Sequence, residues 1–69
     1  MPLSMAKKGE QNQIKKITGK KETVQFLASL GLTMGSPVTL INELGGNVII
    51  NIKESRLAIS KEMANRIMI

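Results

Sequence analysis

Three short segments of the second half of the chain are rich in apolar residues that alternate in part with polar ones, a pattern typical of half-buried β-strands. The segments cover residues 38–43, 47–52 and 55–60. Gly45 and Gly46 lie between the first two segments, and adjacent glycines favour a two-residue hairpin turn because they reach positive φ at little cost. The pattern therefore predicts three consecutive antiparallel strands joined by tight turns.

The same alternation predicts which side chains share a face. One face of the three strands is expected to carry, in order, Val38, Leu40 and Asn42, then Val48, Ile50 and Ile52, then Ser55, Leu57 and Ile59. A second tight turn is expected at Lys53-Glu54. After it, Ser60 can cap a one-turn helix with Glu62 well placed in the first turn. Residues 67–69 then form a last short strand that can close the sheet.

The first half of the chain contains one clear helical pattern, at residues 20–30. One face of this helix carries Val24, Leu27, Ala28 and Gly31. Gly31 is expected just past the helix end in the left-handed conformation, which allows Leu32 to fold back onto Leu27. Thr18 is the predicted N-cap. Phe26 lies inside the helix and is expected to be buried.

Two further strands are expected before this helix. Residues 3–7 are a short apolar-polar stretch that can form an edge strand, whereas residues 11–17 predict a strand with an irregularity. With the helix inserted among five to six short strands and a short C-terminal helical turn, the chain is predicted to be mainly β and to form a small, strongly bent barrel. Residues 1–69 are expected to make a single domain, with a thin stability margin because a chain this short buries only about 60% of its unfolded surface.

The amino-acid composition mainly argues against classes of catalytic and metal-binding site. The chain contains no His, Cys, Asp, Trp or Tyr. The common metal ligands, the common general base and every thiol nucleophile are therefore missing, so we expect no catalytic residue, no cofactor and no high-affinity metal site. The five glutamates are spaced at least eight residues apart and are interpreted as surface carboxylates. Without an apolar segment of about 18 residues or a leader pattern, the sequence indicates a soluble cytoplasmic protein.

The positive charge is concentrated in the first third of the chain. Six lysines and one glutamate in residues 1–21 account for the whole net charge of +5, because four basic and four acidic residues cancel in residues 22–69. A basic segment can be a solvated face, or it can attract an acidic partner, an anionic membrane or nucleic acid. Lys20 and Lys21 oppose the dipole of the predicted helix, which suggests a role other than stability.

Four stretches, in order and at matching spacing, resemble the FeoA (ferrous iron transport protein A) family. They are LSMAKKGE at residues 3–10, IKKITG at residues 14–19, FLASLGL at residues 26–32 and SRLAISKE at residues 55–62. The resemblance implies an SH3-like barrel. It further implies a small accessory of ferrous iron uptake that contacts the FeoB-type membrane transporter, which carries a GTP-binding domain. The implied location is the cytoplasm, at the inner face of the membrane through this partner, with at most a weak or indirect association with ferrous iron.

Partner binding is predicted at Lys20, Lys21, Met34 and Arg56. Two alternatives stay open: a basic nucleic-acid-binding barrel, and a transition-metal-sensing domain. Single-stranded nucleic acid usually stacks on aromatic side chains, and Phe26 is the sole aromatic residue. An arginine finger for a GTPase would have to be Arg56 or Arg66.

Overall fold

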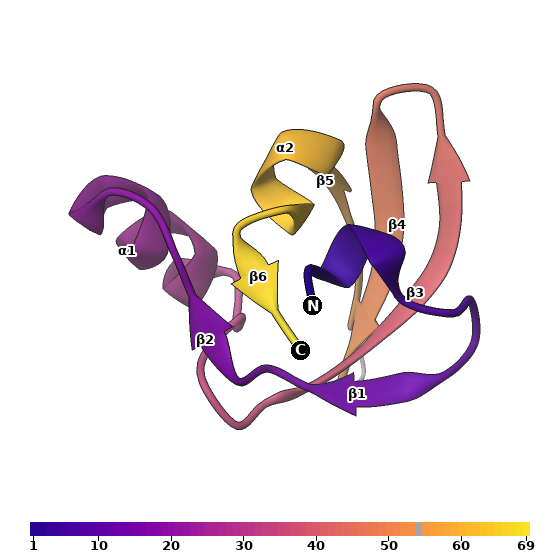
Figure 1. Cartoon of the computed structure of the whole chain (residues 1–69), viewed down its shortest axis with the longest axis horizontal. Coiled ribbons are helices and arrows are strands. Elements are labelled where there is room, and N and C mark those ends of the chain that lie inside the picture. Colours follow the sequence, from indigo (N-terminus) through magenta and orange to yellow (C-terminus); the bar gives the residue numbers. More distant parts are fainter. Residues whose placement is uncertain (54) are drawn as a thin grey trace.

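Six strands and three short helical segments make up the computed structural model, which describes residues 1–53 and 55–69 (Figure 1). In chain order the elements are η1 (Leu3–Met5), β1 (Gln11–Gln13), β2 (Lys16–Ile17), α1 (Lys21–Ser29), β3 (Pro37–Leu44), β4 (Asn47–Ile52), β5 (Ser55–Ser60), α2 (Lys61–Ala64) and β6 (Ile67–Met68). The predicted mainly β class, with one inserted helix and a C-terminal helical turn, is confirmed.

The strands form two antiparallel sheets. One has the order β1-β3-β4-β5 and the other pairs β2 with β6. The chain passes from the first sheet to the second at Ile14 and Lys15, whose N–H groups donate to the carbonyls of Ser36 at 3.0 Å and Met68 at 2.8 Å. This transition is the predicted irregularity of residues 11–17. Pro2 also bridges to Met68, so both termini lie close together (Figure 1).

A β-bulge interrupts the pairing of β3 with β4. Leu40 lies opposite Ile50, but the next pair is Asn42 with Ile49, which leaves Ile41 as the extra residue. A bulge shifts the alternation by one residue, so Asn42 lies on the side of Ile49 rather than on the side of Leu40. The prediction that Asn42 shares the face of Leu40 is therefore wrong. The turn at Gly45, whose φ is 60°, is confirmed.

The core combines the inward faces of β3, β4 and β5 with side chains from both ends of the chain. Its buried members are Leu3, Ala6, Ile14, Leu27, Leu32, Val38, Leu40, Val48, Ile50, Ile52, Ile59, Ala64, Ile67 and Ile69. No charged or polar side chain is buried among the described residues. The hydrophobic effect is therefore the main source of stability, and polar chemistry is confined to the surface.

The N-terminal segment departs from the prediction. Residues 3–5 form the 3-10 helix η1 instead of an edge strand, because this turn directs Leu3 and Ala6 together into the core. Thr18 does not cap α1 either: the N-cap position is Lys20, which makes no side-chain cap bond. The Thr18 hydroxyl donates to the Arg66 carbonyl at 3.2 Å instead.

Helix ends confirm two predictions. At α2, the Ser60 hydroxyl oxygen accepts from the Met63 N–H at 3.2 Å. At the end of α1, Gly31 has φ 95° and donates to the Ala28 carbonyl at 2.9 Å, while Leu32 donates to the Leu27 carbonyl at 3.0 Å. This pair of bonds is the Schellman motif, and it returns Leu32 to the core.

None of the helices in the described part of the chain has both the length and the apolar character needed to cross a bilayer.

Replacing Gly31 with Ala should destabilise the domain by about 1–2 kcal/mol, because an L-residue with a Cβ is strained in the left-handed region. The added Cβ would also lie 3.3 Å from Cδ1 of Ile52. The free energy of unfolding from urea titration measures the effect. Gly46→Ala is the matched control, because a Cβ there meets nothing within 4 Å. Equal stability of the Gly31→Ala variant and the wild type would contradict this account.

Candidate interaction groove between α1 and α2

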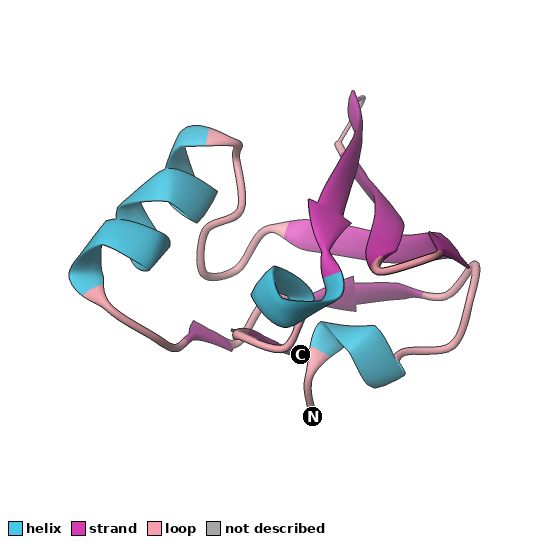
Figure 2. Ribbon diagram, turned by 90° about the horizontal axis from the view of Figure 1, so that it is seen from above, coloured by secondary structure: helices cyan, strands magenta, loops and turns pink. Residues whose placement is uncertain are grey.

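A groove of about 610 Å3 lies between the start of α1 and α2. One side is formed by Gly19, Lys20 and Thr23, and the other by Ser60, Glu62, Met63 and Arg66. In Figure 2, α1 stands at one end of the molecule, apart from the strands β3, β4 and β5. The lining combines a thioether and methylene groups with two cations, a carboxylate and two hydroxyls.

The segment that enters α1 sets the width of this groove. The N–H of Thr18 donates to the Arg66 carbonyl at 2.7 Å, which fixes the chain on both sides of the groove. Gly19 follows with φ 118°. A Cβ placed on Gly19 would lie 3.7 Å from Cδ of Arg66 and 3.7 Å from the Thr23 side chain. The methylene stem of Arg66 therefore runs beside Gly19, where a Cβ would make ordinary van der Waals contact with it, and it is the positive φ that favours glycine.

The start of α1 is electropositive for two separate reasons. Lys20 occupies the N-cap position in an extended conformation but supplies no side-chain acceptor to the first turn. The free N–H groups of a first turn carry partial positive charge. Lys20 and Lys21 then add two full charges, and both residues are exposed. Within the described residues the single ion pair is Lys61 with Glu43. Lys20, Lys21 and Arg66 therefore make no ion pair in that part of the chain, although Glu62 also lines the groove and Glu22 lies in the first turn of α1.

The four residues predicted to bind a partner lie at three separate places. Lys20 lines the groove and Lys21 is the first residue of α1. Met34 follows the other end of α1, a helix of nine residues that spans about 14 Å. Arg56 is on β5, opposite Asn51 of β4. The structure therefore brings together the two lysines but not the set of four, and their role in binding stays a prediction.

The exposed apolar side chains correct one expectation, which concerns Phe26. Phe26 is 51% exposed, because Leu27 takes the core position of that turn. The prediction that Phe26 is buried is wrong. Met34 is 72% exposed and does not fill the barrel interior. The sole aromatic ring of the chain is thus accessible on the outer side of α1, but a single ring is a limited platform for stacking nucleobases.

Sequence reasoning did not find Met63, Thr23 and Ser60 as groove residues, and it considered Arg66 only as a GTPase finger. Their proximity to Lys20 depends on the pairing of β2 with β6, in which Ile17 lies opposite Ile67. No local pattern predicts such a long-range pairing of two-residue strands. The one usable signal was the Thr18-Gly19 pair before the helix, which marks a bend in the chain.

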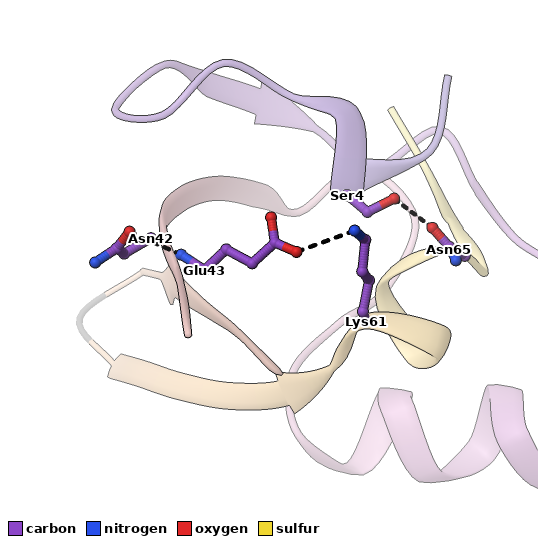
Figure 3. A network of polar contacts seen from close by, with 5 residues as sticks. All are labelled: Ser4, Asn42, Glu43, Lys61 and Asn65. Atoms are coloured by element: carbon purple, nitrogen blue, oxygen red, sulfur yellow. Dashed lines mark hydrogen bonds and ion pairs between the residues drawn. The ribbon is translucent and has the colours of Figure 1, made fainter. Parts of the chain in front are cut away.

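A second polar cluster, which links the tip of the β3–β4 hairpin to α2, is structural. Nζ of Lys61 lies 3.0 Å from Oε1 of Glu43, and the backbone N–H of Glu43 donates to Oδ1 of Asn42 at 2.8 Å (Figure 3). Ser4 donates to Oδ1 of Asn65 nearby. Exposed pairs of this kind contribute little to stability. Among the described residues, no three His, Cys, Asp or Glu side chains gather closely enough to hold a metal ion.

Comparison with solved structures gives the fold class of the protein. A structure of Stenotrophomonas maltophilia FeoA complexed with zinc, described as a prokaryotic SH3 domain protein, superposes with a TM-score of 0.83 over 99% of this chain and 87% of that one, at 18% identity. The chain therefore has an SH3-like fold.

Sequence then identifies the family. The FeoA domain profile matches residues 1–69. A Methanocaldococcus jannaschii protein that carries the name Fe(2+) transport protein A is 40% identical over 68 residues, which are 99% of this chain and 83% of that one. A crystal structure of an iron uptake regulatory protein (FeoA) is 31% identical, with a TM-score of 0.88 and coverage of 97% and 91%. The chain belongs to the FeoA family, a family associated with ferrous iron transport, as its sequence motifs had indicated.

Replacing Lys20 with Ser should stabilise the domain by about 1 kcal/mol, because Ser supplies the missing N-cap acceptor in a position that already has extended φ and ψ. Chemical denaturation measures the change. Lys21→Ser removes the same charge from the same helix end but lies one residue past the cap, so it should stabilise less. If both variants raised the free energy of unfolding equally, the removal of charge rather than the new N-cap would be the cause of the stabilisation.

Proposed function

We propose that the chain is a non-enzymatic accessory protein of ferrous iron uptake, and that it acts by contact with the FeoB-type transporter. The observation that carries the proposal is the groove between α1 and α2, in which an uncapped helix start and the side chains of Lys20 and Arg66 face open space. Family membership supplies the link to ferrous iron transport.

The groove suits a protein segment better than a small substrate. Met63 and the methylene stem of Arg66 provide apolar contact, while Lys20 supplies positive charge at the rim. Complementary charge at an interface mainly accelerates association and selects the partner. An acidic segment with an apolar anchor therefore fits this surface, and a cytoplasmic region of the transporter is the proposed source of it.

The residue types of the chain, and the residue at the N-cap of α1, also support an adaptor role. The sequence offers no imidazole or thiol as base or nucleophile. Lys20 is also retained at an N-cap position where Ser, Asp or Asn would stabilise the helix more. A residue that is poor for local stability but exposed at a groove is typical of a binding surface.

The double variant Lys20→Glu with Lys21→Glu should weaken binding to the full-length transporter by about tenfold or more, since two attractive charges at the rim become repulsive. Titration calorimetry with the transporter in detergent micelles, with and without ferrous iron, measures the dissociation constant. A parallel titration with the isolated GTP-binding region locates the contact on the partner.

Lys7→Glu with Lys8→Glu is the matched control. Both lysines are exposed and the change in net charge is the same, but neither residue lines the groove. Equal weakening by both pairs would show that only overall charge matters. Absence of binding to either preparation would contradict the proposed function. Salt-dependent binding to single-stranded nucleic acid in that case would favour the alternative of a basic nucleic-acid-binding barrel.

A further inference from the structure

Strand β5 forms one edge of the larger sheet. In the order β1-β3-β4-β5, it pairs with β4 on one side, and in the part of the chain that the structure describes it has no strand on the other side. Its pairing with β4 runs in unbroken register from Asn47 opposite Ser60 to Ile52 opposite Ser55. The pairing of the strand is therefore regular over six residues, unlike that of β3 with its bulge.

Backbone geometry shows which groups point outward from this edge. The N–H of Lys61 donates to the Gly46 carbonyl at 2.9 Å, toward the β3–β4 hairpin, and Ser60 before it is still extended. Backbone N–H and C=O groups point to alternate sides along a strand, so those of Leu57 and Ile59 also point toward β4. The N–H groups of Arg56, Ala58 and Ser60 point to the open side, and no backbone acceptor for them occurs among the described residues.

Natural proteins usually protect such an edge with proline, a bulge, a covering helix or several charges. β5 contains neither proline nor a bulge, and Arg56 is its one charged residue. Ala58, at the centre of the strand, is exposed. The other free edge of the same sheet, β1, has only three residues. An accessible edge of six residues is thus the most complete template for strand addition on this molecule.

We propose that two copies of this chain associate through β5, antiparallel and about a two-fold axis that passes between their Ala58 residues. In this register Ala58 lies opposite Ala58, and Arg56 lies opposite Ser60 of the second copy. The outward backbone groups of these residues then meet as hydrogen-bonded pairs. Leu57 of each copy lies opposite Ile59 of the other, which extends the apolar face across the axis.

Charge favours this register over its neighbours. Moving the axis toward the N-terminus by two residues would place Arg56 directly opposite Arg56, and like charges opposite each other destabilise a strand pair. In the Ala58-centred register, Arg56 instead lies opposite Ser60, next to the first turn of α2 in the second copy. That turn carries Lys61, which is already paired with Glu43, and the carboxylate of Glu62. The strand is thus self-complementary in its backbone bonding and avoids a pair of like charges in this register, as a two-fold interface requires.

The interface is small, because a strand of six residues spans only about 20 Å. We therefore expect a reversible dimer with a dissociation constant of about 0.1–1 mM, in the range of weak and transient contacts. Sedimentation velocity over a concentration series from about 10 µM to 2 mM tests this, because these concentrations bracket the expected constant. This inference does not depend on the transporter contact, since no partner other than the chain itself is required.

Charge-swap variants test the register directly. Ala58→Lys and Ala58→Glu should each weaken self-association by about tenfold, because each places two like charges opposite each other across the axis. An equimolar mixture of the two variants should recover association, since Lys then faces Glu. Gln25→Lys and Gln25→Glu are the matched controls, because Gln25 is exposed on α1 and carries the same charge changes away from β5. Circular dichroism verifies that each variant is folded.

A crosslink provides a second, independent measurement. The natural chain has no cysteine, so Ala58→Cys introduces a single thiol. Hydrogen-bonded antiparallel pairs place their Cα atoms about 5.5 Å apart, a separation that suits a disulfide. Ala58→Cys should therefore form a disulfide dimer faster than Gln25→Cys on mild oxidation. A wild-type chain that remains monomeric throughout, together with equal oxidation rates of the two cysteine variants, would overturn the proposal.

Discussion

Three backbone hydrogen bonds between the two ends of the chain hold this small domain closed. Lys15 donates to the Met68 carbonyl at 2.8 Å, Thr18 to the Arg66 carbonyl at 2.7 Å, and Ile69 to the Met1 carbonyl at 2.8 Å. These contacts create the β2–β6 sheet and bury Ile67. They also fix where α1 starts relative to α2. Both the core and the groove therefore depend on these hydrogen bonds.

Such closure matters more in a chain of this length than it would in a larger domain. Small domains bury a smaller share of their surface, so the loss of a few contacts removes a large part of the stability. The core is entirely apolar among the described residues. The polar and charged side chains of that part of the chain lie at the surface, and the surplus of lysines before and at the start of α1 is the most distinctive feature of this surface.

Local signals predicted the regular parts of the fold well. Alternation located β3, β4 and β5, and Gly31 located the end of α1 with its Schellman motif. Predictions failed where a long-range contact or a single extra residue decided the outcome. Ile41 bulges and moves Asn42 to the other face, and Thr18 bonds to the distant Arg66 instead of capping α1.

In the candidate site, too, local signals could be found in the sequence, whereas long-range contacts could not. Lys20 and Lys21 could be selected from the sequence, because cations at a helix start conflict with the helix dipole. Met63 and Arg66 could not be selected from the sequence, because they lie more than forty residues after Lys20. The pairing of β6 with β2 brings them to the same groove. Arg56 was selected as one of only two arginines, yet its position on an edge strand became visible only in the sheet order.

Two features of this domain leave stabilising interactions unused, and they meet at Ser60. Among the described residues, the N-cap of α1 has no side-chain acceptor, and β5 has no strand on its outer side. Ser60 ends that edge strand and also lines the groove that faces the uncapped helix. Departures from local rules concentrate where proteins bind, because optimal local structure would occupy the groups that a partner needs. A second copy on β5 would bring its Arg56 toward Glu62 at the groove, so self-association and partner binding would compete for the same side of the molecule.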